Sequence, residues 1–232
     1  MKIDVVCHCW RYPRLLRLFL TALWRWPPPR VVGVRLLLYL DADAGADECW
    51  KAAGAAARPL CERGIAMFVA AGESTWARTR SLGRHAACLS SDADWLWLAG
   101  VDWLVGPGTF RQLHRSLLRA QQDVLRPRAF QESGAWRPVA AAAQADFPII
   151  EAWPEFRGLE RRKFCRTHGC LFYRGTAARA RGYCGGLASP EPRPGEFRHP
   201  LAEDQVFAAS AGPLGVADCW PMIHVRHPPG EG

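Results

Sequence analysis

Hydrophobic and polar positions follow two different patterns along the first half of the chain. Continuous apolar runs predict four buried strands, at residues 3–9, 31–40, 65–70 and 95–101. Between them we expect three helices, at residues 13–26, 46–63 and 74–90, and the first has the apolar spacing of an amphipathic helix. The first helix begins at Pro13 and is ended by three consecutive prolines. Because strands and helices alternate, we expect a mostly parallel sheet covered by helices on both faces.

The second half of the chain is less regular. Its pattern predicts a helix at residues 110–122 and short strands at residues 124–127 and 169–174. Residues 128–162 are rich in alanine and tryptophan and favour no particular element. A loop rich in proline, glutamate and arginine at residues 188–200 is followed by a short helix predicted at residues 201–211. No internal repeat or second domain is visible, so we expect one α/β domain over residues 1–232.

Composition agrees with a globular protein that buries a full core, since 49% of the residues are hydrophobic and 22% are charged. The nine cysteines are odd in number and include no Cys-x-x-Cys, which disfavours a disulfide framework and a zinc ribbon. Reduced thiols in the cytoplasm are the simpler expectation, with a zinc site at Cys165, His168 and Cys170 as the minor alternative.

No secretory signal is visible, and no apolar run approaches the ~20 residues that span a bilayer. We therefore expect no transmembrane segment. Trp24 and Trp26 are expected mainly as buried aromatic residues, with peripheral contact to a membrane surface, together with Arg25, as the alternative.

Basic residues outnumber acidic ones by 30 to 22, which gives a formal net charge of +8, and only three of the 30 are lysines. Guanidinium groups bind phosphates through paired hydrogen bonds, so one interpretation of the arginine content is that the protein binds an anionic ligand. An arginine-rich composition also arises in a GC-rich genome whatever the function. No basic run or zinc-finger spacing indicates a nucleic acid as partner.

Asp102 is the most informative residue, because it follows the apolar run of residues 95–101 directly. A carboxylate at the end of a buried strand lies at the crevice where open α/β sheets bind ligands. Such a position suits a phosphate ester bound through a metal ion. Asp102 would otherwise be a solvated turn residue before the Gly-Pro-Gly at residues 106–108.

The order of the motifs resembles that of the inverting family 2 glycosyltransferases, which have the GT-A fold. The resemblance covers nearly the whole chain, although each motif is short. It rests on VVCHCWRYP at residues 5–13, DAD at 41–43, RSLG at 80–83, GVD at 100–102, ED at 203–204, and the histidines at 224 and 227.

The resemblance implies a nucleotide-diphosphate sugar as donor, bound by residues 1–108, and an acceptor bound by residues 109–232. Asp102 would hold Mn²⁺ or Mg²⁺ with help from His224 or His227. The remaining donor contacts would come from Cys9 and Trp10 at the base, Asp41 and Asp43 at the base and ribose, and Arg78 or Arg80 at the phosphates.

The resemblance also implies that Asp204 takes the proton from the acceptor hydroxyl, while Glu203 orients Asp204 or binds the acceptor. The acceptor itself stays open among saccharides, lipids, small molecules and peptides. The same two residues could instead complement the dipole of the helix that they begin. Asp41 and Asp43 could likewise cap a helix, and Arg80 and the two histidines could be ordinary surface or core residues.

One departure from the family pattern concerns the metal. Gly100 stands where the family has the first aspartate of its Asp-x-Asp motif. Either Asp102 alone is enough to bind the metal ion, or metal binding is lost and arginines neutralise the phosphates.

Two alternative functions follow from the sequence. A nucleotidyltransferase is disfavoured because Trp10 to Pro13 stand in place of a glycine-rich phosphate loop. A non-catalytic protein that binds a nucleotide sugar is the other.

Overall fold

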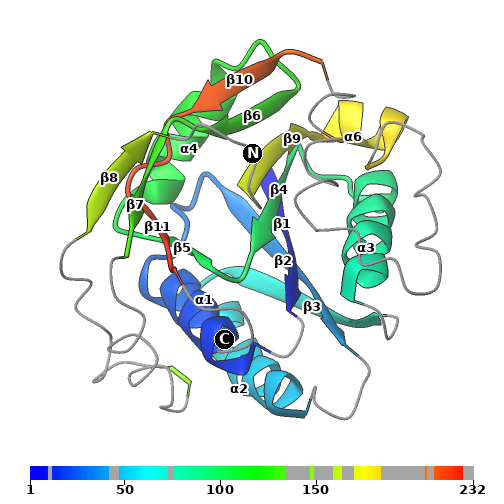
Figure 1. The fold of residues 1–232 in the computed structure, drawn as a ribbon, viewed down its shortest axis with the longest axis vertical. Helices are drawn as coiled ribbons and strands as arrows, with labels where there is room; N and C mark the ends of the chain where they lie inside the picture. Colours follow the sequence, from blue (N-terminus) through cyan, green and yellow to red (C-terminus); the bar gives the residue numbers. More distant parts are fainter. Residues whose placement is uncertain are drawn as a thin grey trace.

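A seven-stranded mixed sheet forms the centre of the protein, with strand order β10-β6-β9-β4-β1-β2-β3 (Figure 1). The computed structural model describes residues 1–9, 12–41, 47–72, 76–133, 147–148, 159–163, 170–183, 207 and 212–226. All neighbouring strands are parallel except β9, which is antiparallel to both β4 and β6. The expected mostly parallel sheet is thus confirmed. Its strands are β1 (Lys2–Cys9), β2 (Gly33–Asp41), β3 (Ile65–Gly72), β4 (Trp95–Gly100), β6 (Val124–Pro127), β9 (Cys170–Arg174) and β10 (Leu214–Ala217).

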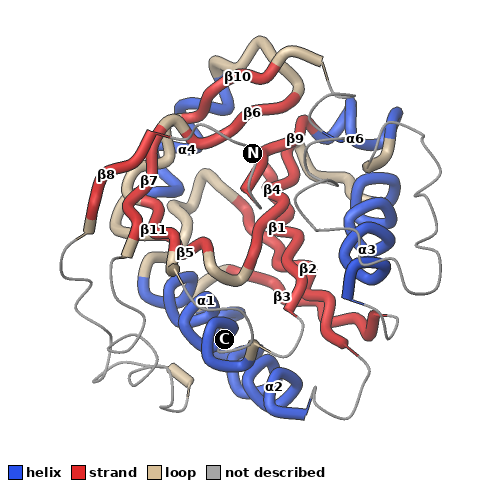
Figure 2. The backbone as a smooth tube through the Cα atoms, viewed as in Figure 1, coloured by secondary structure: helices blue, strands red, loops and turns tan. Residues whose placement is uncertain are grey.

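Helices cover both faces of this sheet (Figure 2). Along β1, Val5 and Cys7 belong to the larger core cluster, which contains buried residues of α1, α2 and α4. Val6 points the other way, into the cluster shared with α3 and α6. Alternate side chains of one strand therefore serve two cores, which explains its continuous apolar sequence. The helices are α1 (Pro13–Arg25), α2 (Asp47–Glu62), α3 (Trp76–Ser90), α4 (Thr109–Leu118) and α6 (Gly175–Arg181).

The predicted elements of the first half are present with small shifts at their ends. In the second half, the helix expected over residues 110–122 ends earlier, at Leu118. After the helix, the segment around residues 120–123 is held against β9. Arg174, the last residue of β9, donates hydrogen bonds to the carbonyl of Ala120 at 2.8 Å and to Asp123 Oδ1 at 2.9 Å. None of the helices in the described part of the chain is long and apolar enough to cross a membrane.

A second, four-stranded sheet was not predicted from the sequence. Its order is β5-β11-β7-β8, and its strands are β5 (Trp103–Val105), β7 (Ala129–Glu132), β8 (Glu160–Lys163) and β11 (Met222–His224). β5 begins just after the end of β4, and β11 pairs with it antiparallel. This pairing brings a late segment of the chain to the edge of the main sheet.

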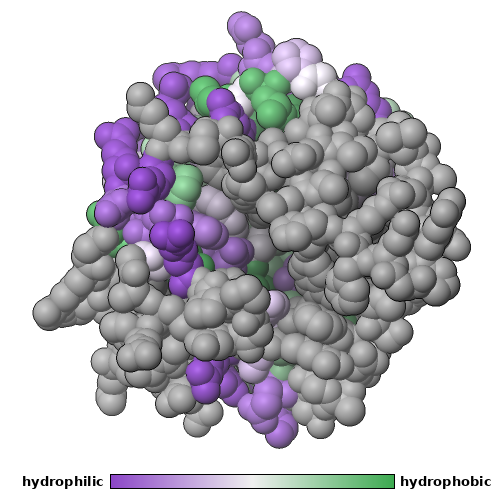
Figure 3. All heavy atoms as spheres, viewed as in Figure 1, coloured by the Kyte–Doolittle hydropathy of each residue, from purple (hydrophilic) through white to green (hydrophobic). Residues whose placement is uncertain are grey.

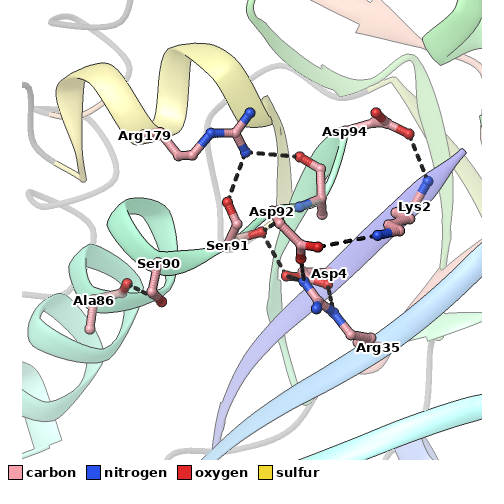
Figure 4. Close-up of polar contacts among 10 residues, drawn as sticks. Lys2, Asp4, Arg35, Ala86, Ser90, Ser91, Asp92, Asp94 and Arg179 are labelled. Atoms are coloured by element: carbon pink, nitrogen blue, oxygen red, sulfur yellow. Dashed lines mark hydrogen bonds and ion pairs between the residues drawn. The ribbon is translucent and has the colours of Figure 1, made fainter.

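A buried ion pair connects β1 and β2 near the start of both strands (Figure 4). Asp4 is 1% exposed and accepts two hydrogen bonds from Arg35, Nε to Oδ1 and Nη2 to Oδ2, each at 2.7 Å. Ser91 Oγ donates a third at 2.6 Å to Oδ2. Arg35 also pairs with the exposed Asp92. Three segments distant in sequence are thus joined at the end of the sheet opposite to Asp102.

Candidate functional site

The carboxyl ends of β1, β2, β3 and β4 meet at one edge of the main sheet. In the strand registers, Cys9 pairs with Leu40, Asp41 with Gly72, and His8 with Gly100. Because α3 begins shortly after β3 ends, its first turns start from the same edge. Those turns carry the predicted phosphate contacts Arg78 and Arg80. The backbone therefore gathers residues 9, 41, 78, 80 and 102, although the side chains of residues 41, 78 and 80 lie outside the described part.

Asp102 and His224 are in direct contact at this edge. Asp102 lies in the turn between β4 and β5, and its Oδ2 is 3.2 Å from Nε2 of His224. The backbone N–H of Val225 donates a 2.8 Å hydrogen bond to the carbonyl of Asp102. Both side chains are about one quarter exposed, 25% and 24%. The pairing of β5 with β11 is what joins these residues, which are 122 positions apart.

The imidazole of His224 is held on several sides. Trp103 stacks on it with ring centroids 4.7 Å apart, and Phe130 meets it edge-on at 5.9 Å. Its Nδ1 faces Oε1 of Glu132 at 3.6 Å. Burial by itself would lower the pKa of His224, because it disfavours the imidazolium. The hydrogen bond to Asp102 and the negative charges of Asp102 and Glu132 have a larger effect, so the pKa is raised. The ring thus has a carboxylate beside each nitrogen.

Comparison of the sequence with family models and with curated proteins finds no match. Solved structures do match the fold. S. aureus TarS (residues 1–349) in complex with UDP-GlcNAc gives a TM-score of 0.61 at 12% identity, over 100% of this chain and 60% of the TarS chain. The mannosyltransferase PcManGT from Pyrobaculum calidifontis, in complex with GDP-Man and Mn²⁺, gives 0.55 at 13% identity, over 99% and 58%. The chain has a GT-A-like fold. It spans about three fifths of the length of these two chains.

Within this GT-A-like fold, the side chain of Cys9 points away from the sheet edge. It is 2% exposed, and its Sγ lies 3.7 Å from Sγ of Cys49, which is also buried. Burial and the neighbouring thiol of Cys49 raise the pKa of the Cys9 thiol well above its ordinary value. A ligand at the edge can therefore meet the backbone of Cys9 but not its sulfur.

Several predicted residues fall outside the described part of the chain. They are Trp10, Asp43, Cys165, His168, Glu203, Asp204 and His227. Phe207, three positions after Asp204, is described. It is 1% exposed, stacks on Tyr183 with centroids 4.7 Å apart and meets Tyr173 at 5.1 Å.

Sequence reasoning missed Glu132, which faces His224 from β7. The segment that contains it favoured no element, and Glu132 alone resembles an ordinary surface residue. The sequence does contain a signal for the strand of His224, because the apolar run at residues 222–225 is interrupted only by this histidine. Such a polar residue inside a short apolar run indicates a strand whose side chain is held by partners.

Gly100 also has a structural role in the site. A Cβ built at this position would overlap Oδ1 of Asp102. The carboxylate of Asp102 therefore folds back over the glycine, and a side chain at residue 100 would displace it. The absence of a side chain at Gly100 thus leaves the space that Oδ1 of Asp102 occupies.

Proposed function

We propose that this protein transfers a sugar from a nucleotide-diphosphate sugar to an acceptor hydroxyl, with inversion and with the help of a divalent metal ion. The observation that carries the proposal is the contact between Asp102 and His224 at the carboxyl edge of the sheet. Support comes from chains of the same fold, which bind UDP-GlcNAc in one case and GDP-Man with Mn²⁺ in another.

The Asp102–His224 pair fits two ligands of an octahedral cation. Two adjacent ligands at about 2.1 Å from such an ion lie about 3 Å apart, close to the observed 3.2 Å between Oδ2 and Nε2. Within the described ranges, no three His, Cys, Asp or Glu residues group as a metal site. Phosphate oxygens of the donor and water would complete the coordination, as is common for Mg²⁺. When bound, the ion would act as a Lewis acid that neutralises charge on the departing diphosphate.

The other donor contacts would come from the same edge. Arg78 or Arg80, in the first turns of α3, would donate charge-assisted hydrogen bonds to the phosphates. Backbone groups of Cys9, together with Trp10, would lie at the base, and Asp41 with Asp43 at the base and ribose. These contacts would fix the anomeric carbon beside the acceptor.

On the opposite face of the sugar, Asp204 would accept the proton of the acceptor hydroxyl as its oxygen attacks the anomeric carbon. Attack opposite to the leaving diphosphate gives inversion, and Glu203 would orient Asp204 or bind the acceptor. Asp204 is at most about 11 Å along the chain from Phe207. Phe207 stacks on Tyr183, whose hydroxyl accepts a 2.9 Å hydrogen bond from Arg84 of α3. This anchor near the helix of Arg80 supports the role proposed for Asp204.

The glycine at position 100 favours one alternative, a protein that binds a nucleotide sugar without transferring it. Thermal shift with UDP, GDP, UDP-sugars and GDP-sugars, each with and without Mn²⁺, tests donor binding. At a hundred-fold excess over Kd, a ligand stabilises the folded state by about 2.7 kcal/mol, or roughly 5–10 °C in Tm for a chain of this size. We expect one base to give such a shift only with Mn²⁺, and the shift to be lost in Asp102→Ala. No shift with any nucleotide would refute both the glycosyltransferase and the non-catalytic binding protein. A shift without turnover would refute the glycosyltransferase and support the binding protein.

The variant Gly100→Ala tests the position of the Asp102 carboxylate. The added methyl would displace Oδ1, so we expect Mn²⁺ affinity to fall about tenfold or more. Only a flexible side chain has to move, so Tm should stay within about 3 °C of the wild-type value. Gly54→Ala in α2 is the matched control, because a Cβ there meets no atom within 4 Å. Unchanged Mn²⁺ affinity in Gly100→Ala, measured by titration calorimetry with the nucleotide present, would contradict this arrangement.

A further inference from the structure

Glu132 lies beside His224 in the small sheet and has no part in the function proposed so far. The two residues are partners in the parallel pairing of β7 with β11. Oε1 of Glu132 is 3.6 Å from Nδ1 of His224, on the side of the ring opposite to Asp102. The side chain of Glu132 is only 19% exposed. A half-buried carboxylate in this position needs a reason, because burying charge is costly.

Glu132 is itself fixed by two arginines, one from a strand and one from the segment after another strand. Nε of Arg162, in β8, is 3.3 Å from Oε2, and Nε of Arg226, just after β11, is 4.0 Å from Oε1. Both arginines are more than half exposed. Figure 3 shows the hydrophilic side chains that gather over this sheet. The carboxylate is thus held from both sides, and its Oε1, which lies 4.0 Å from Arg226, also faces the imidazole of His224.

We propose that Glu132 is a positioning residue, which holds the ring of His224 with Nδ1 toward itself and Nε2 toward Asp102. This inference rests on the proposed function, in which Nε2 and Asp102 bind the metal ion. Trp103 and Phe130 fix the plane of the ring, and the two carboxylates fix which nitrogen faces which way.

The chemistry of imidazole explains why such a partner matters. A ring nitrogen can bind a cation only when it carries no proton, so the proton of the neutral ring must reside on the other nitrogen. For His224 that nitrogen is Nδ1, which faces Glu132. Nδ1 is buried and makes no hydrogen bond within the described part of the chain, and the carboxylate of Glu132 lies just beyond hydrogen-bond distance, at 3.6 Å. A carboxylate at this place stabilises the proton on Nδ1 by its charge, which favours the tautomer with a free Nε2 and makes that nitrogen a better ligand. Loss of such outer partners typically costs about 10–100-fold in metal affinity.

The test is a double-mutant cycle read out by Mn²⁺ binding rather than by activity. Free Mn²⁺ is measured by electron paramagnetic resonance with UDP present, and in a second series with GDP. In the protein with His224, we expect Glu132→Ala to weaken Mn²⁺ binding about 10–100-fold. In a His224→Gln background, the same substitution should change the affinity less than twofold, because the ring through which Glu132 acts is absent.

Two further variants separate positioning from charge and from folding. Glu160→Ala removes a carboxylate from the adjacent strand β8, where Glu160 is the strand partner of Glu132 and binds Arg162 at 2.6 Å. It should leave Mn²⁺ affinity within about twofold. Glu132→Gln keeps the shape and one acceptor oxygen, so it should lose less affinity than Glu132→Ala. It also keeps the test decisive if the alanine variant does not fold.

The outcomes distinguish this inference from the function on which it rests. If the wild-type protein binds no Mn²⁺ with either nucleotide, the metal-assisted function fails and this inference fails with it. If the wild type binds Mn²⁺ but Glu132→Ala binds it equally well, only the role of Glu132 is refuted. An equal loss in the His224→Gln background would also refute it, because Glu132 would then act through its charge alone.

Discussion

Replacing Arg35 with methionine is expected to cost the folded protein about 3 kcal/mol, which lowers Tm by roughly 6–12 °C. Asp4 is 1% exposed and Arg35 provides two of its hydrogen bonds. The substitution therefore leaves a buried carboxylate whose remaining side-chain donor, within the described part of the chain, is Ser91. The estimate lies at the low end for broken buried pairs because the side chain of Arg35 is 34% exposed and partly screened. Chemical denaturation of the wild type and the variant measures the difference.

The matched control is Arg58→Met in α2. Arg58 forms an ion pair with Glu62 at 3.0 Å, but the two side chains are 90% and 63% exposed. Exposed pairs at this spacing contribute about 0.3–0.5 kcal/mol, so Tm should hardly change. If the damage in Arg35→Met comes from the stranded carboxylate, it must shrink when Asp4→Asn is added. An undiminished loss in that background would show that the aliphatic stem of Arg35 matters and the ion pair does not.

The Asp4–Arg35 pair also shows how much of the main sheet could be predicted from the sequence. The runs at residues 3–9 and 31–40 predicted buried strands correctly because burial on both faces requires nearly continuous apolar sequence. Each run nevertheless contains one charged residue near its start, Asp4 and Arg35, and the structure aligns them directly across parallel strands. Opposite charges inside two apolar runs could therefore have predicted both the pairing and its register.

The small sheet could not be predicted in this way. Its strands are only three or four residues long, and the decisive pair, β5 with β11, joins segments more than a hundred residues apart. No periodicity develops over such short segments, so their pairing leaves no pattern in the sequence. Asp102 could be identified because it ends a long buried strand. Its contact with His224 was expected only through the resemblance, and Glu132 was missed altogether.

These observations give the two sheets different roles in the proposed function. The main sheet supplies the edge where the backbones of Cys9, Asp41 and the start of α3 meet. The small sheet adds His224 and Glu132 to the one carboxylate that follows β4. The glycine at position 100 therefore does not simply remove a ligand, since the histidine from β11 stands beside the remaining aspartate.

Replacing Asp204 with asparagine is expected to lower kcat by about 10²–10⁴-fold, the usual loss for a general base. Asparagine keeps nearly the same shape but cannot accept the proton of the acceptor hydroxyl. Because the proposed donor contacts lie at the sheet edge and on α3, the Kd for the donor should stay within about twofold. Turnover is measured by release of the nucleoside diphosphate from the sugar donor that gives a thermal shift, and donor affinity by titration with Mn²⁺ present.

The matched control for Asp204→Asn is Asp92→Asn, at the opposite end of the sheet. Asp92 is 60% exposed and forms ion pairs with Lys2 and Arg35, all far from the carboxyl edge, so its loss should leave kcat and the donor Kd unchanged. A parallel loss of turnover and donor binding in Asp204→Asn would assign Asp204 to the folding of its segment, which Phe207 anchors against Tyr183. Unchanged turnover would remove Asp204 as the base and turn attention to Glu203. Only a large fall in kcat with an unchanged donor Kd agrees with a base that acts on the acceptor alone.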